Sequence, residues 1–85
     1  MLKPIAPLFV IEPEEVQENP NGFQSTEGKL SGKAKILAVP EDETFYQVGD
    51  IAVINTLYPL KIVVGNEKEV IYIIGKEDMY GKWED

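Results

Sequence analysis

The chain has 85 residues, with 8 basic and 15 acidic side chains, a net charge of −7, and neither cysteine nor histidine. The missing residue types exclude disulfides, thiolate zinc sites and histidine-based catalytic pairs. The acidic surface opposes binding to nucleic acid or to an anionic membrane, and no apolar run approaches the roughly 20 residues of a membrane span. We expect a single domain over residues 1–85, in the cytoplasm, without signal peptide, metal or cofactor.

Short apolar runs separated by turn residues predict an all-β fold. Residues 33–39 alternate, so that Ala34 and Ile36 share one face of a strand. Gly65 supplies a turn between two later strands, and residues 76–80 form a possible helical turn. The strands are expected at residues 5–12, 33–39, 48–55, 57–64 and 69–75.

The segment 17–33 is long, glycine-rich and polar, and its only large apolar side chains are Phe23 and Leu30. Loops longer than about 12–15 residues are uncommon in small domains unless they are functional or disordered. Two interpretations follow: a solvated insertion, or a binding loop that orders on contact and uses Phe23 or Leu30 as its anchor.

A second loop, residues 40–47, contains three consecutive acidic residues, Glu41, Asp42 and Glu43. Their spacing matches no calcium-binding loop. We interpret this segment as a solvated acidic turn rather than a cation site.

The runs 5–11 and 69–74 are apolar on both faces. A one-layer barrel buries only one face of each strand. Either the patterning of the core is imperfect, or the second face is covered by self-association through these strands. The candidate contacts between subunits are Ile5, Leu8, Phe9, Val10, Val70, Ile71, Tyr72 and Ile73.

The order of several short motifs resembles that of one protein family over essentially the whole chain. The motifs are a strand after Lys3-Pro4, a long glycine-containing loop, Gly32-Lys-Ala-Lys-Ile-Leu-Ala-Val39, Val48-Gly-Asp-Ile-Ala-Val-Ile-Asn55, Tyr58, Lys61, Glu69-Val-Ile-Tyr-Ile-Ile74 and the acidic turn Glu77-Asp78. This arrangement is similar to that of the GroES-type co-chaperonins, the chaperonin-10 family.

The resemblance implies a small irregular β-barrel that assembles into a seven-membered ring. Such a ring caps a GroEL-type chaperonin, which binds the ATP, and closes a chamber in which unfolded client proteins fold. Residues 17–33 correspond to the mobile loop that docks on the chaperonin, and in this family the first strand of one subunit pairs with the last strand of its neighbour. The docking residues by this correspondence are Gly22, Phe23, Gln24, Ser25 and Leu30.

Three features depart from the family pattern. Three aliphatic residues normally follow the loop glycine, whereas only Phe23 is apolar after Gly22. The segment 40–47 is too short for the usual roof hairpin, and Pro7-Leu8 replaces an Asp-Arg pair. A shortened roof and divergent strands look more like a phage-encoded co-chaperonin, which would act in the host cytoplasm.

Two other classes of protein share this size and charge. An acidic β-barrel can mimic nucleic acid and inhibit an enzyme, but its carboxylates would follow one face, and here they concentrate in turns and at the tail. An enzyme based on paired carboxylates would need a cleft, for which the sequence carries no signal. The residues therefore favour a binding or assembly protein.

Overall fold

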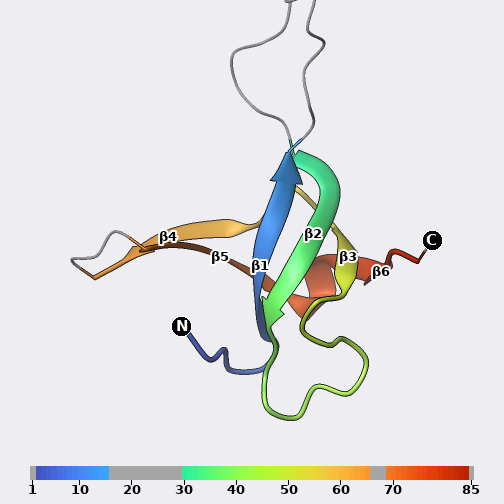
Figure 1. The fold of residues 1–85 in the computed structure, drawn as a ribbon, viewed down its shortest axis with the longest axis horizontal. Coiled ribbons are helices and arrows are strands. Elements are labelled where there is room, and N and C mark those ends of the chain that lie inside the picture. Colours follow the sequence, from blue (N-terminus) through green and yellow to red (C-terminus); the bar gives the residue numbers. More distant parts are fainter. Residues whose placement is uncertain (1, 16–29, 66–68, 85) are drawn as a thin grey trace, which may run out of the picture.

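The computed structural model describes residues 2–15, 30–65 and 69–84 (Figure 1). All six strands lie in one antiparallel sheet in the order β4-β5-β1-β2-β3-β6, which confirms the all-β prediction. The elements are β1 (Leu8–Glu15), β2 (Leu30–Ala38), β3 (Ile51–Ile54), β4 (Leu60–Val64), β5 (Glu69–Gly75), the 3-10 helix η1 (Lys76–Asp78) and β6 (Met79–Lys82).

The register of the central strands builds the hydrophobic core. Phe9 of β1 lies opposite Ile74 of β5, and Ile11 of β1 lies opposite Ile36 of β2. Because side chains alternate along a strand, this register brings the apolar positions of three strands together, as the sequence pattern predicts. The buried cluster consists of Phe9, Ile11, Ala34, Ile36, Tyr46, Ala52, Ile54, Ile74 and Met79.

The two edges of the sheet are β4 and β6. Among the described residues, β4 pairs with β5 and β6 pairs with β3. Figure 1 shows the β4–β5 hairpin extending to one side of the molecule, away from β3 and β6. Closure of this sheet into a barrel stays a prediction. No helix in the described part of the chain is long and apolar enough to cross a membrane.

Local hydrogen bonds shorten three of the predicted strands at their beginnings. The Ile5 carbonyl accepts the N–H of Leu8 at 2.8 Å, so β1 begins at Leu8 rather than at residue 5. Before β3, the Asp50 carboxylate accepts the N–H of Gln47 at 2.9 Å and holds a turn. The amide oxygen of Asn55 likewise accepts the N–H of Leu57 at 3.1 Å before β4 begins. In the last two cases a polar side chain bonds to nearby backbone and so competes with the strand ladder.

The strand β6 was not predicted. The sequence indicated a helical turn over 76–80, but the helical part ends at Asp78 and the chain then pairs with β3, placing Met79 opposite Ile54. Four residues that include Gly81 carry little strand signal of their own. The pairing partner, rather than local propensity, determines this element.

The central position of β1 leads to a test of the core. Phe9 is fully buried, and we expect Phe9→Ala to lower the free energy of unfolding by about 3–5 kcal/mol through lost burial and an unfilled cavity. Leu57→Ala truncates a side chain that is 82% exposed and should change stability by less than about 0.5 kcal/mol. Urea denaturation measures both. Equal losses in the two variants would contradict the assignment of the core.

Candidate functional site

The two described residues that flank the candidate docking segment are paired in the sheet. Glu15, the last residue of β1, pairs with Leu30, the first residue of β2. Next to this pair, the Ser31 hydroxyl donates to the Glu14 carboxylate at 3.1 Å. Residues 16–29 therefore begin and end at adjacent positions of the sheet. The predicted docking residues Gly22, Phe23, Gln24 and Ser25 lie outside the described residues, and Leu30 starts β2.

The eight candidate subunit contacts occupy different environments in the single chain. Phe9, Val10 and Ile71 are buried, Tyr72 and Ile73 are half-buried, and Ile5, Leu8 and Val70 are exposed. The two segments also pair with each other within one chain, where Val10 lies opposite Ile73. Much of the apolar character on both faces of these strands is therefore explained by folding of the chain itself.

The identity of the last strand differs from the prediction. The segment 69–75 is an interior strand, β5, with β4 on one side and β1 on the other. The chain continues into β6, whose outer edge is unpaired among the described residues. The last strand of the described chain is therefore β6 rather than β5, and the contact between first and last strands that the family resemblance implies stays a prediction.

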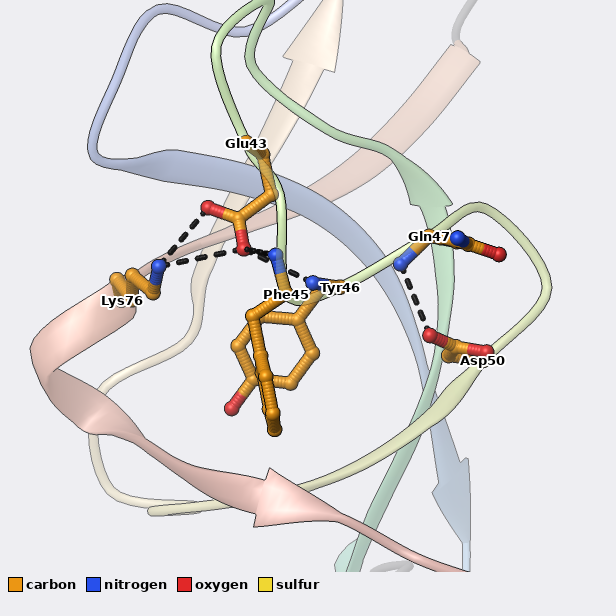
Figure 2. A network of polar contacts seen from close by, with 6 residues as sticks. All are labelled: Glu43, Phe45, Tyr46, Gln47, Asp50 and Lys76. Atoms are coloured by element: carbon orange, nitrogen blue, oxygen red, sulfur yellow. Dashed lines mark hydrogen bonds and ion pairs between the residues drawn. The ribbon is translucent and has the colours of Figure 1, made fainter.

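Residues 40–50 are held in place by the carboxylate of Glu43. Figure 2 shows its Oε2 atom accepting the backbone N–H groups of Phe45 and Tyr46, both at 2.9 Å. The Lys76 ammonium, from η1, donates to the same carboxylate at 3.0 and 3.2 Å. Only 5% of the Glu43 side chain is exposed. The expectation of a solvated acidic turn is therefore correct for Glu41 and Asp42, which are exposed, and wrong for Glu43.

The surroundings of Glu43 favour its charged form. Burial by itself would raise the pKa of the Glu43 carboxyl, but the Tyr46 N–H, the Lys76 ammonium and the Phe45 N–H outweigh burial and lower the pKa below its ordinary value of 4.5. Burial also raises the pKa of the Tyr46 phenol, which keeps this ring neutral in the core. The contacts of Glu43 fix the backbone at residues 45 and 46. The described residues contain no acidic cluster that could hold a metal.

The loop of residues 40–50 contributes an aromatic pair, Phe45 and Tyr46, that contacts both β1 and β6. The Tyr46 ring packs edge-on against Phe9, with centroids 5.3 Å apart, and Phe45 packs edge-on against Tyr46 at 4.8 Å. The Lys82 ammonium of β6 lies 4.5 Å from the Phe45 ring and 3.7 Å from the Asp50 carboxylate. Residues 40–50 are thereby joined to β1, to η1 and to β6.

A surface pocket of about 490 Å³ lies beside β1, β2 and the C-terminal segment. Glu12, Lys33, Lys35 and Trp83 are among the residues that line it, and the Lys33 ammonium lies 4.2 Å from the centre of the Trp83 ring. The pocket mixes both signs of charge, and one of its lysines is engaged with the aromatic ring. We assign no chemistry to it.

No protein-family model matches the chain, and no curated protein is significantly similar to it.

The Glu43 network leads to a prediction about stability and its dependence on pH. Glu43→Gln should lower the free energy of unfolding by roughly 1–3 kcal/mol at neutral pH, because two N–H groups and Lys76 lose a charged acceptor. The part due to Lys76 is small, since that side chain is half exposed. Glu41→Gln, the same change at an exposed position of the same loop, should have almost no effect.

The pKa of Glu43 is lower in the folded chain than its ordinary value, so its stabilisation is complete above pH 4.5 and is lost as the pH falls further. Chemical denaturation at a series of pH values should show the two curves, wild type and Glu43→Gln, converging below that pH. A difference in stability that stays constant down to strongly acidic pH would contradict this role of the carboxylate.

Proposed function

We propose that the protein is a co-chaperonin that caps a GroEL-type chaperonin ring and closes its folding chamber. In this proposal residues 17–33 dock on the chaperonin, with Phe23 as the apolar anchor, and residues 40–47 form a reduced roof. The chain assembles as a ring of seven barrel-like subunits, and the ATP is bound by the partner. The basis is the ordered set of motifs shared with the co-chaperonin family.

The placement of the two loops within the fold is the observation that best supports this proposal. Residues 16–29 depart from the end of the β1–β2 pair formed by Glu15 and Leu30. Residues 39–50 connect the other end of β2 to β3, so the points at which the two segments join the sheet lie at opposite ends of β2 (Figure 1). A cap needs this separation, because one end must reach the chaperonin while the other covers the chamber.

The edges of the sheet supply surfaces suited to a ring. In the single chain, Ile5 is 79% exposed before β1, and Tyr80 of β6 is 68% exposed. Pairing of the residues before β1 with β6 of the next copy would cover both side chains and complete an open edge. Such a contact joins two different surfaces, as a closed ring requires.

Ring assembly also explains how a weak docking loop can function. Ordering a long loop on its partner costs conformational entropy, so each contact is weak by itself. Seven linked loops convert weak contacts into high overall avidity. Weak individual contacts also permit release when the chaperonin changes its nucleotide state.

A nucleic-acid mimic has less support. Such a protein would present its carboxylates to a partner along one surface. Glu43 and Asp50 instead accept backbone N–H groups of their own loop and face Lys76 and Lys82. These two charges are used to hold residues 40–50 in place.

The ring leads to a prediction about mass. We expect light scattering after size exclusion to give a multiple of seven subunits of 9.5 kDa each. Ile5→Asp should break this assembly, because it buries a charge at the contact between copies. Val48→Asp, the control, introduces the same charge at another exposed apolar position and should leave the mass unchanged. A wild-type chain that stays monomeric or dimeric at all concentrations would rule out the ring.

The docking loop leads to a separate prediction. Phe23→Ala should weaken capping of a GroEL-type chaperonin in the presence of ATP at least tenfold, because avidity multiplies the loss of each anchor. The free energy of unfolding should stay close to that of the wild type. Leu57→Ala removes an exposed apolar side chain outside the loop and should cap normally. Normal capping by Phe23→Ala would exclude Phe23 as the anchor, and Leu30 would then be tested in the same way.

A further inference from the structure

The outer edge of β4 is open and apolar in the described part of the chain. Among the described residues β4 is paired along one edge only, with β5. Leu60, Val63 and Val64 are 58%, 59% and 45% exposed, although all three are large and apolar. An exposed apolar edge strand is a template for pairing with another strand. We propose that β4 pairs antiparallel with β4 of a second copy, around a two-fold axis at Ile62.

The sequence of β4 is complementary to itself in this arrangement. An antiparallel pair centred on Ile62 places Leu60 opposite Val64 of the other copy, and Ile62 opposite its own equivalent. These three residues share one face of the strand because they alternate with Lys61 and Val63. The pairing therefore forms an unbroken stripe of six apolar side chains, to which cross-strand contacts give stability.

The sheet of each copy extends this stripe. On β5, Ile71 and Ile73 lie opposite Ile62 and Leu60, so this face stays apolar at two of its three positions, and Glu69 lies opposite Val64. On the other face, Val63 lies opposite Val70, which is also exposed. Figure 1 shows the hairpin extending away from the rest of the sheet, so that its outer edge is accessible to another copy.

The single charge of β4 selects the geometry. A lysine on an edge strand, such as Lys61, commonly discourages pairing with another strand. In a parallel, in-register pair it would face Lys61 of the other copy, which is unfavourable. In the two-fold antiparallel pair it faces Val63 instead, along which its methylene stem can pack while the ammonium stays in water. The charge of Lys61 thus permits the two-fold antiparallel pair and opposes the parallel pair.

The residues at the two ends of β4 also limit the length of the proposed β4–β4 ladder. Pro59 lacks a backbone N–H to donate, and Gly65 begins the turn with φ of +66°. These two residues are themselves opposite each other in the proposed register, so the ladder ends at the same place on both sides. The alternative edge, β6, is less regular, because its pairing with β3 shifts register between Gly81 and Met79.

The charge on Lys61 allows a sharp test in the full chain. Val63→Lys places an ammonium opposite Lys61 of the other copy, twice in each pair, and should halve the mass measured by light scattering. Val63→Glu places a carboxylate opposite the same lysine and should retain the wild-type mass. Val63 is exposed, so the folded chain accommodates either change. Equal masses for wild type and both variants would overturn the proposal, and so would halving by both variants, which would indicate an apolar contact without this register.

A cross-link tests the position of the axis. The chain has no cysteine, so Ile62→Cys introduces the only thiol, and at a two-fold axis it meets its own equivalent. We expect a disulfide-linked dimer under oxidising conditions, at least tenfold more abundant than with Tyr80→Cys, the control on the β6 edge. Cross-linking by Tyr80→Cys but not by Ile62→Cys would overturn the pairing in favour of a contact through β6.

This inference is independent of the proposed co-chaperonin function. The pairing of β4 is read from the ratio of the wild-type mass to the Val63→Lys mass, which should be two. The ring is read from the Val63→Lys mass itself, which is seven subunits if the ring forms and one if it does not. Either result can fail while the other holds.

Discussion

The packing of Tyr46 against Phe9 joins two parts of the molecule that the hydrogen bonds of the sheet do not connect. Phe9 lies in the central strand, and Tyr46 comes from the loop between β2 and β3. The loop reaches the core because the Glu43 carboxylate fixes the backbone at residues 45 and 46 and is itself held by Lys76. Without that carboxylate, the N–H groups of Phe45 and Tyr46 would lose their acceptor, and the partly buried N–H of Tyr46 would carry a desolvation cost.

A second constraint follows from the size of the chain. A domain of this length buries a limited share of its surface, and a single sheet has two edges that its own strands do not complete. Many of the apolar side chains that remain exposed lie on the β4–β5 hairpin and near the two ends of the chain, as at Val63 and Ile5, and others, such as Val48, lie in the loop between β2 and β3. Association with other copies is the physical means by which such a chain can gain more buried surface. The proposed ring and the proposed β4 pairing use different edges and are therefore compatible.

The outcome for individual residues shows where sequence patterns are informative. Alternation correctly identified Ala34 and Ile36 as residues of the buried face, because burial of one face imposes a period of two on a strand. It did not identify Phe9, which was a candidate subunit contact and is a core residue of the single chain. It did not distinguish Glu43 from its neighbours Glu41 and Asp42, because three adjacent carboxylates look alike until the backbone folds around one of them. Glu43 accepts the N–H groups two and three residues later, but Glu41 and Asp42 have such N–H groups as well, and Lys76 comes from a distant segment, so no local signal identifies Glu43. The candidate docking residues were inferred from motif order, and they stay a prediction, because residues 22–25 lie outside the described residues.

The sequence by itself determined the fold class, all five predicted strands to within three residues of their observed ends, the buried face of residues 33–39, and the classes of chemistry that the missing cysteine and histidine exclude. Hydrophobic alternation, turn residues and composition are local properties, so they can be read along the chain. The tertiary structure decided which strands became neighbours: it placed 69–75 inside the sheet, created β6 from a segment with little strand propensity, and left β4 at an edge. It also decided the role of Glu43. These outcomes depend on contacts between residues far apart in the chain, which supply hydrogen bonds and burial that no local pattern encodes.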